Sequence, residues 1–363
     1  MKQVAIVGCG IVGATIAYEL SQIPGFQITV IDRQPPAQAS TGAALGVLMG
    51  NISQKKPKSR AWRLRHASMQ RYATLIPELE ARTGRQIPYN HHGILKLCFE
   101  ADEIAKWKKW IELRHSQGLK LEWLAIEALK KRYPQIESTQ LVGAVYSPDD
   151  GQVDPVLLTQ ALVEAATLAG VTFHFDATVT GAKIAASSPQ VCQSIETTRG
   201  EFPADEFIVA AGLGSMPFAS ALNQTITVKP VLGQALHLRL PETSRLPQPV
   251  VTGEDIHIVP LGETECWVGA TVEFPDAAGE VVADEAQLQA VLDGAVAFCP
   301  MLSSAKILRQ WSGLRPRPQG QAAPIIGYLE GYRNVLLATG HYRNGVLLAP
   351  ATAGEICRML GDR

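Results

Sequence analysis

The chain has 363 residues, which is long for a single hydrophobic core and suits two domains. Hydrophobic residues make up 46% and charged residues 18%, and Lys and Arg are spread along a chain whose net charge is −1 at pH 7. These values exclude a disordered protein, and they argue against a nucleic-acid binder, which would gather its basic residues on one face.

The first 32 residues carry the pattern of a strand, a helix and a second strand. Val4–Val7 is a short β-branched and apolar run that ends at a glycine, which is typical of a buried parallel strand. Ile11–Ile23 has apolar or small residues at helical spacing and ends at a Pro-Gly pair, and Gln27–Ile31 is a second β-rich run. Together these segments predict a βαβ unit.

The middle of the chain predicts further helices and strands. The helix from Pro155 to Ala169 has the clearest ends, because Asp154 is a good N-cap, proline occupies the first position and Gly170 follows the last turn. Other helices are expected at Trp62–Thr83 and Glu103–Gln117, and strands at Gly93–Phe99, Val171–Val179 and Phe207–Ala211.

From Val228 to Val272 the pattern changes to successive strands separated by Pro and Gly turns, which indicates an antiparallel sheet. A helix at Asp284–Phe298, a strand at Val335–Ala338 and a last helix near Pro350–Leu360 follow. We therefore expect an α/β fold with a Rossmann-type nucleotide-binding domain built from discontinuous segments, and an antiparallel-sheet domain inserted into it. The predicted nucleotide-binding domain comprises residues 1–84, 143–219 and 306–363, and the sheet domain residues 85–142 and 220–305.

The hexapeptide from Gly8 to Gly13 fits the dinucleotide fingerprint G-x-G-x-x-G between the first strand and its helix. Gly8 permits a tight turn, Gly10 lets the backbone approach a pyrophosphate, and Gly13 allows close packing of helix and strand. The helix N-terminus offers free N–H groups to the phosphates. Asp32, 19 residues after Gly13, can accept from ribose hydroxyls and would repel a 2′-phosphate, which argues against NADP. A glycine turn without any ligand is the alternative that this context disfavours.

Four later segments separate FAD from NAD. Ser40–Leu48 is a run of small residues, Asp150–Pro155 leads into a helix, Val209–Gly212 ends a strand with small residues, and Gly340–Pro350 reads GHYRNGVLLAP. Together with the fingerprint they resemble the D-amino-acid oxidase superfamily of flavoproteins, most closely the glycine oxidases, over nearly the whole chain. The resemblance implies a glutathione-reductase-like fold of the D-amino-acid oxidase type, with the substrate bound by the sheet domain.

The resemblance also implies that FAD is bound non-covalently, since Cys299 and Cys357 fall outside the flavin segments. Small residues let backbone N–H groups reach an anionic cofactor. A helix N-terminus after the GHYRNG run would stabilise the negative charge that gathers at the N1/O2 edge of reduced flavin. The residues expected at FAD are Gly8, Gly10, Ile11, Val12, Gly13, Asp32, Arg33, Ser40, Thr41, Ala43, Ala44, Gly46, Val47, Leu48, Val179, Ala211, Gly212, His341, Arg343, Asn344, Gly345, Val346 and Leu347.

The stretch from Trp311 to Pro316 resembles the glycine oxidase segment whose arginine binds the substrate carboxylate, and that residue is Arg315 here. The following proline holds its backbone extended, and a guanidinium offers paired donors that match a carboxylate. An interdomain salt bridge is the alternative role for Arg315, and Arg317 is the alternative ligand. Arg343 matches a second family arginine near the flavin and the substrate.

Three positions depart from the family pattern. His257 stands where glycine oxidases have a tyrosine that contacts the substrate, and Val272 stands where a methionine lines the pocket. Val47 replaces a larger residue near the flavin. His257 either donates to a carboxylate or packs in the core as an ordinary histidine. These changes leave the reaction type intact and leave the substrate open.

The resemblance implies oxidation of glycine, another small amino acid or a secondary amine, as in thiamine precursor supply. Arg315, with His257, would orient the substrate while a hydride passes to flavin N5 without a protein base, and water would hydrolyse the imine to a 2-oxo acid and ammonia. Electrons would then pass to oxygen, giving hydrogen peroxide, or to a quinone or other carrier, as in a D-amino acid dehydrogenase. A flavin-binding module without turnover and an NAD dehydrogenase are the alternatives of other classes.

The remaining features predict the setting of the protein. The six cysteines lie far apart with no CxxC pair, which predicts reduced thiols in a cytoplasmic protein. No apolar run approaches the roughly 20 residues needed to cross a bilayer, and the first residues run into the glycine motif instead of a cleavage site. No cluster of His, Cys, Asp or Glu has metal-ligand spacing. The family resemblance implies a homo-oligomer.

Overall fold

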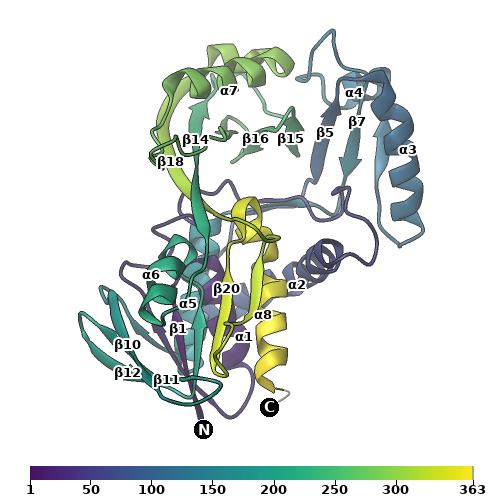
Figure 1. The fold of residues 1–363 in the computed structure, drawn as a ribbon. Helices are drawn as coiled ribbons and strands as arrows, with labels where there is room; N and C mark the ends of the chain where they lie inside the picture. Colours follow the sequence, from purple (N-terminus) through teal and green to yellow (C-terminus); the bar gives the residue numbers. More distant parts are fainter. Residues whose placement is uncertain (362–363) are drawn as a thin grey trace.

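The computed structural model describes residues 1–361, which form two parts, each built around its own large sheet (Figure 1). In the part that holds both ends of the chain the sheet has six strands, and all of its pairings are parallel except the one between the two strands at one edge. In order across the sheet these strands are β19 (Ile325–Tyr328), β20 (Val335–Thr339), β13 (Glu206–Val209), β1 (Lys2–Val7), β2 (Phe26–Ile31) and β9 (Thr172–His174).

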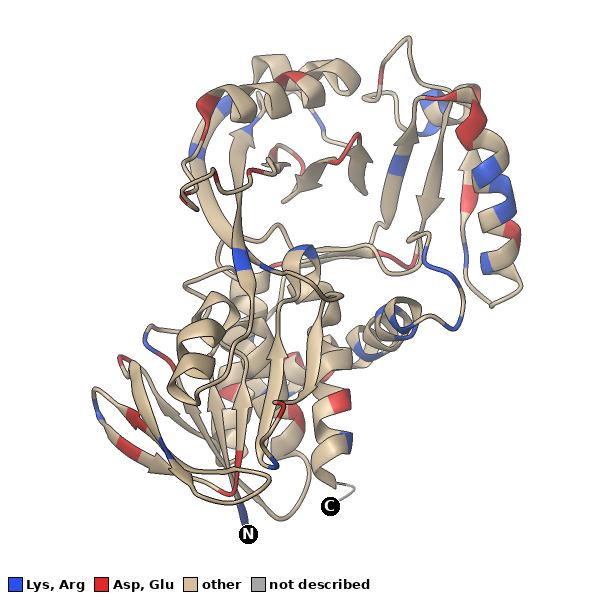
Figure 2. Cartoon of the chain, viewed as in Figure 1, with Lys and Arg blue, Asp and Glu red and all other residues tan. Residues whose placement is uncertain are grey.

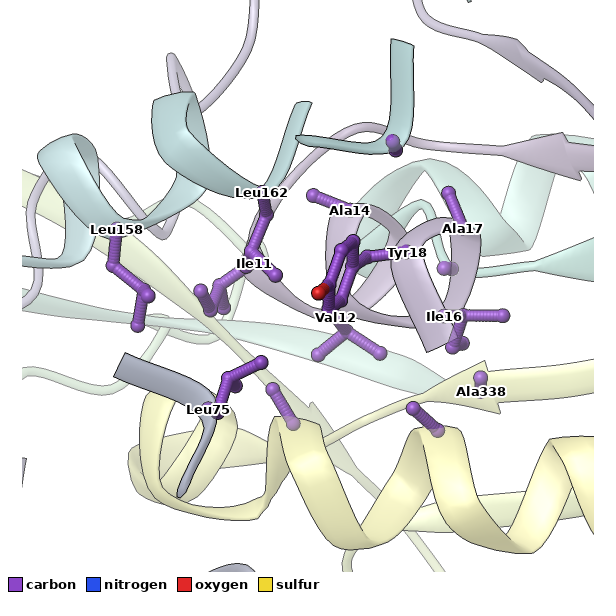
Figure 3. Close-up of a cluster of buried hydrophobic side chains, with 14 of the residues drawn as sticks. Ile11, Val12, Ala14, Ile16, Ala17, Tyr18, Leu75, Leu158, Leu162 and Ala338 are labelled. Carbon is purple, nitrogen blue, oxygen red and sulfur yellow. The ribbon is translucent and has the colours of Figure 1, made fainter. Parts of the chain in front are cut away.

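Helix α1 (Ile11–Ser21) lies at the centre of the core of this part, because nearly all of its side chains are apolar or small and buried. Figure 3 shows its residues between Leu158 and Leu162 of α5 (Pro155–Leu168) on one side and Leu75 of α2 (Arg60–Thr83) on the other, with α8 (Gly345–Gly361) beneath them. Segments from the start, middle and end of the sequence therefore share one core, as the discontinuous nucleotide-binding unit predicts.

The second part contains an eight-stranded sheet that is antiparallel except for one parallel pairing. Helix α7 (Glu285–Phe298) packs on this sheet, and α3 (Ala101–His115) and α4 (Ile126–Arg132) lie near its far edge (Figure 1). Its strands, in order, are β18 (Lys306–Pro318), β14 (Val228–Arg239), β17 (Glu265–Gly269), β16 (Ile256–Pro260), β15 (Val250–Gly253), β5 (Ile94–Cys98), β7 (Gly143–Ser147) and β6 (Glu122–Leu124).

Two small three-stranded sheets and several short helices complete the described structure. One sheet contains β10 (Val179–Ala185), β11 (Val191–Thr197) and β12 (Gly200–Pro203), and the other contains β3 (Val47–Leu48), β8 (Gly151–Val153) and β4 (Tyr89–Asn90). The short helices are α6 (Ser215–Ala221), η1 (Gly212–Gly214), η2 (Pro300–Ser304) and η3 (Tyr342–Asn344).

The predicted α/β fold is confirmed, while the division into two domains stays a prediction. Two segments that we assigned to the nucleotide-binding domain, β7 and β18, pair within the eight-stranded sheet instead. Strand β18 pairs with β14 from Lys306 to Pro318, and this long ribbon runs from one part of the molecule into the other (Figure 1). If strand pairing decides the domain boundaries, residues 143–147 and 306–318 belong to the sheet domain.

The last helix begins five residues earlier than predicted, at Gly345, and Pro350 lies inside it. A proline inside a helix leaves the carbonyl four residues before it without its usual N–H partner, which is why the sequence predicted a helix start there. That carbonyl belongs to Val346, and it accepts a hydrogen bond of 2.5 Å from the Tyr72 hydroxyl of α2. A tertiary contact thus compensates for the missing donor.

The single strand predicted from Val171 to Val179 is wrong, because β9 and β10 belong to different sheets. The chain turns between them at Asp176, whose φ of 57° is left-handed. Ala177 then donates its N–H to the Asp32 carbonyl at 3.0 Å, so the segment bends over the end of β2 instead of continuing β9. Asp is one of the few residue types that tolerate this conformation.

Charged residues of both signs are interspersed over both parts of the molecule, and α3 carries both along its length (Figure 2). None of the helices within residues 1–361 combines the length and apolar character needed to span a membrane.

Candidate active site

Three neighbouring strands of the six-stranded sheet each end in a glycine with positive φ. Gly8 after β1 has φ 106°, Gly212 near the end of β13 has φ 56°, and Gly340 after β20 has φ 66°. In parallel sheets, ligands bind where neighbouring strands present their carboxyl ends together. The predicted cofactor residues from three distant segments therefore meet at the carboxyl ends of these three strands.

The glycine turn before α1 has no room for side chains. A Cβ on Gly8 would lie 2.6 Å from the carbonyl oxygen of Ala210, and a Cβ on Gly13 would lie 1.9 Å from the carbonyl oxygen of Gly8. Helix α1 has Gly10 as its N-cap, with no side-chain hydrogen bond. A helix N-terminus whose N-cap residue has no side chain suits a pyrophosphate, which approaches backbone N–H groups directly.

Asp32 lies beside this turn, as the sequence predicts, and it already binds two backbone groups. Its two oxygens accept from the N–H of Cys9 at 2.6 Å and of Gln34 at 2.9 Å. Each carboxylate oxygen retains a second lone pair, which a ribose hydroxyl would occupy. Arg33, the next predicted cofactor residue, has an exposed side chain. Val179 starts β10, three residues after the turn that bends over Asp32.

The small-residue segment from Ser40 to Leu48 packs against the long strand β18. Ser40 Oγ donates to the Leu314 carbonyl at 2.6 Å, and Trp311 Nε1 donates to the Ala43 carbonyl at 3.2 Å. Thr41 faces the glycine turn, where its Oγ accepts from the Ile11 N–H at 3.0 Å. The close packing of this segment against β18 explains why its residues are small, since Gly313 of β18 lies directly against Ala43. Ala44 packs against the core of the nucleotide-binding part, and Gly46 leads into β3, which contains Val47 and Leu48.

Helix α8 begins shortly after Gly340, the positive-φ glycine that follows β20. Gly345 is its first residue, and Val346 and Leu347 are buried in its first turn. Asn344, just before it, accepts a hydrogen bond from Arg65 of α2 at 3.1 Å. His341 is only 3% exposed and lies 2.9 Å from the Thr352 hydroxyl. That hydroxyl donates to Leu348, so His341 Nε2 carries the proton and donates to Thr352.

Arg315 is held by backbone carbonyls and has no acidic partner among the ion pairs of residues 1–361. Its guanidinium donates to the carbonyls of Leu232 at 2.9 Å and of Thr271 at 3.0 Å. It lies flat against Gly233 of β14, where a Cβ would be 2.1 Å from Arg315 Nη2. Burial and the nearby Arg343 lower the pKa of this guanidinium, whose charge is fixed in place but not neutralised. A carboxylate ligand would supply the missing counter-ion.

Arg343 and His257 face the same space from the two parts of the molecule. Arg343, in η3, pairs with Asp255 at 3.5 Å, and Asp255 lies in the exposed turn between β15 and β16. His257 has a buried Nδ1 with no hydrogen-bond partner among the described residues. Burial and Arg343 lower its pKa to about 4, so the ring is neutral at pH 7. An unpartnered buried nitrogen is costly, and a bound ligand would satisfy it.

Val272, a predicted pocket position, and Arg317, the alternative carboxylate ligand, differ in their surroundings. Val272 is half-buried between two buried residues, Thr271 and Glu273. Arg317 is exposed and lies over the rings of Phe274 and Tyr342, at 5.1 and 5.6 Å. Arg315 and Arg317 are two positions apart on one strand and therefore lie on the same face. Arg315 is the better carboxylate ligand, because its guanidinium is partly buried and fixed by two hydrogen bonds.

A family model described as FAD dependent oxidoreductase matches residues 3–359, which is almost the whole chain. The chain belongs to this family. The match confirms the resemblance to the D-amino-acid oxidase superfamily and the choice of FAD over NAD.

The sequence of this family member aligns with named relatives over all or nearly all of its length. It is 34% identical to the bifunctional protein ThiO/ThiG of Synechocystis sp. over 100% of the chain and 52% of that protein. The chain thus spans about half the length of this bifunctional relative. It is 28% identical to a glycine oxidase of Geobacillus kaustophilus, over 96% of the chain and 90% of that protein. The crystal structure of glycine oxidase from Geobacillus kaustophilus matches with a TM-score of 0.86 and 27% identity, covering 100% of this chain and 96% of that one.

The site of this family member includes residues that the sequence interpretation missed. Gly233 makes room for Arg315, and a glycine inside a predicted strand was the available signal, because it often marks a close approach. Asp255 gave no signal, since it pairs with Arg343 only through the tertiary fold.

Replacing Gly233 with alanine is expected to displace the Arg315 guanidinium, because the new Cβ would lie 2.1 Å from Nη2. We expect the apparent affinity for a carboxylate substrate or inhibitor to fall by about tenfold. Titrating the visible flavin spectrum with a carboxylate ligand measures this. Gly181→Ala, in the distant β10, is the matched control, and an unchanged affinity in Gly233→Ala would contradict the placement of Arg315.

Acid is expected to destabilise the fold through its buried histidines. Burial and Arg60 lower the pKa of His341 to about 3, against 6.5 in the unfolded chain. The contribution is fully present above pH 6.5 and is lost as the pH falls toward 3, since only the unfolded chain takes up the proton. The loss is about 1.4 kcal/mol per pH unit for one such histidine. Urea unfolding at pH 7.5, 6.5 and 5.5 measures the slope, which His341→Gln should reduce and His92→Gln, an exposed control, should not.

Proposed function

We propose that this family member oxidises the carbon–nitrogen bond of glycine, another small amino acid or a secondary amine. Its similarity to proteins named glycine oxidase over nearly the whole chain supports the proposal. The observation that carries it is the half-buried guanidinium of Arg315, which two carbonyls fix, which has no acidic partner in residues 1–361 and which lies near Arg343 and His257. This arrangement suits a ligand with one carboxylate.

FAD fits the residues present. The N-terminus of α1, whose N-cap is Gly10, would hold the pyrophosphate, Asp32 the ribose, and the N-terminus of α8 the pyrimidine edge of the ring. When bound, FAD accepts the hydride that leaves the substrate α-carbon.

The residues of this chain bind and orient the substrate. Arg315 binds the carboxylate and, because two carbonyls fix its guanidinium, sets the direction of the α-carbon. His257 is neutral at pH 7, so it offers a hydrogen bond without adding charge. Arg343 brings positive charge to the face that also receives the N-terminus of α8, and both favour negative charge there. Water then converts the released imine to a 2-oxo acid and ammonia.

The test is an anaerobic screen in which purified protein is mixed with glycine, sarcosine, D-alanine and other amines. We expect a yellow protein whose flavin absorbance near 450 nm is bleached by at least one small amino acid. Bound flavin that no amine bleaches would favour a flavin-binding module without turnover, and colourless protein that cannot be reconstituted would exclude the proposal. With the active amine, peroxide formation indicates an oxidase, whereas dye reduction without peroxide indicates a dehydrogenase that uses a carrier. The cytoplasmic setting, the non-covalent attachment and the homo-oligomer stay predictions.

A further inference from the structure

The segment from Gly50 to Lys55 follows β3 directly and is held by two buried side chains of opposite charge. Strand β3 contains Val47 and Leu48, two of the residues that the family resemblance predicts at FAD. Because the backbone is continuous, hydrogen bonds that hold the segment from Gly50 onward also restrict the positions of Val47 and Leu48.

Asp150 binds the N–H groups of this segment. Its carboxylate accepts from Gly50 at 2.9 Å, from Asn51 at 2.8 Å and from Ile52 at 2.7 Å. Ser147 adds a hydroxyl donor at 2.8 Å. Asp150 is 2% exposed, so its oxygens are satisfied by the protein and not by water. A carboxylate that receives three consecutive N–H groups defines the path of that backbone closely.

Arg114 of α3 binds carbonyls of the same segment. It donates to Asn51 at 3.1 Å, to Ser53 at 2.5 Å and to Lys55 at 3.0 Å. The guanidinium is 1% exposed and stacks on Trp62, with its central carbon 3.9 Å from the ring centre. None of the ion pairs within residues 1–361 includes Arg114. Its only described polar side-chain partner is Gln117, at 2.8 Å.

The two charges act on each other through the peptide between them. Asn51 gives its N–H to Asp150 and its carbonyl to Arg114, so one residue is held from both sides. Each buried charge would be costly alone, and each lowers the cost of the other. Asp150 also directly precedes β8, whose Gly151 and Gln152 pair with Leu48 and Val47. The pair therefore links α3 and the β7–β8 turn to β3.

We propose that Asp150 and Arg114 are positioning residues for the reaction at the flavin, because they fix the segment that follows β3 and so the placement of Val47 and Leu48. The inference rests on the proposed function and on the prediction that Val47 and Leu48 of β3 lie at FAD. We call the two side chains the charge clamp.

The charge clamp is tested with Asp150→Asn in the FAD-loaded protein. The matched control is Asp149→Asn, because Asp149 is the adjacent acid and is exposed. We measure FAD content, the visible flavin spectrum, the flavin reduction potential against reference dyes, and the rate of anaerobic reduction by the active amine at saturation. Asp150→Asn is expected to keep FAD, to shift the spectrum and potential, and to slow reduction by about tenfold or more. Asp149→Asn should match the wild type in all four.

A second variant decides the outcome if Asp150→Asn does not fold. Arg114→Lys keeps the charge but loses the fork that spans three carbonyls, and Lys109→Gln on the exposed face of α3 is its control. An Arg114→Lys protein that binds FAD with shifted spectrum and slowed reduction supports the clamp. Folded clamp variants that match their controls in spectrum, potential and rate overturn it. Failure of the wild type itself to bind flavin would instead overturn the proposed function, so the two failures are distinguishable.

Discussion

Replacing Arg315 with alanine is expected to lower kcat/KM for the active amino acid by about 100- to 1000-fold while FAD stays bound. The guanidinium is the half-buried cation to which we assign the substrate carboxylate, and it belongs to β18 and not to the glycine turn at α1. Removing it takes away both the charge and the fixed donors. Steady-state kinetics with the active amine and the absorbance ratio of flavin to protein measure the two effects.

The control for this variant is Lys306→Ala, which removes an exposed cation from the same strand. It should leave the kinetics and FAD content unchanged. A substrate amine without a carboxylate should be affected less by Arg315→Ala than an amino acid is. Kinetics that are unchanged in Arg315→Ala would contradict the assignment, and Arg317→Ala would then be the next variant to measure.

Replacing Gly13 with alanine is expected to weaken FAD binding by about 100-fold, so that the protein is isolated largely colourless. The added Cβ would lie 1.9 Å from the carbonyl oxygen of Gly8, and both groups belong to the backbone of the turn. Neither can move without opening the glycine turn that is expected to hold the pyrophosphate. FAD content after purification and a titration of the apoprotein with FAD measure the change.

Gly354→Ala is the matched control, because its new Cβ would meet no atom within 4 Å. Gly354 lies inside α8, so alanine there should keep the yellow colour and raise the free energy of unfolding by roughly 0.5 to 1 kcal/mol. A Gly13→Ala protein that retains a full complement of FAD would show that this turn does not hold the cofactor.

The parts of the fold that the sequence predicted best are those in which local signals agree. The unit from β1 to β2 combines an apolar strand, a glycine turn and a helix that ends at a Pro-Gly pair, all within about 30 residues. The helix α5 was predicted with its cap, and Asp154 accepts from the N–H groups of Val156 and Leu157 at 2.9 Å as expected. Each of these signals depends only on neighbours in the sequence.

The parts that were wrong or missed depend on partners far away in the chain. Pro350 indicated a helix start, and only the hydroxyl of Tyr72, 278 positions earlier, makes its place inside α8 acceptable. The charge clamp was missed because Asp150 and Arg114 bind backbone groups, which carry no side-chain pattern to recognise. The family resemblance predicted Arg315 and Arg343 as site residues. Only the folded structure shows that Arg315 lies against Gly233 and that Arg343 pairs with Asp255.

The interleaving of α1, α2 and α8 in one core has a consequence for the order of events during synthesis. The glycine turn is synthesised before α8, which packs against α1 only after 334 further positions, from Ile11 to Gly345, have been translated. Until then α1 exposes an apolar flank to water, and the N-terminus of α8, which we predict at the flavin ring, has not been made. The predicted FAD site is therefore completed only when α8 packs on α1 and the core closes.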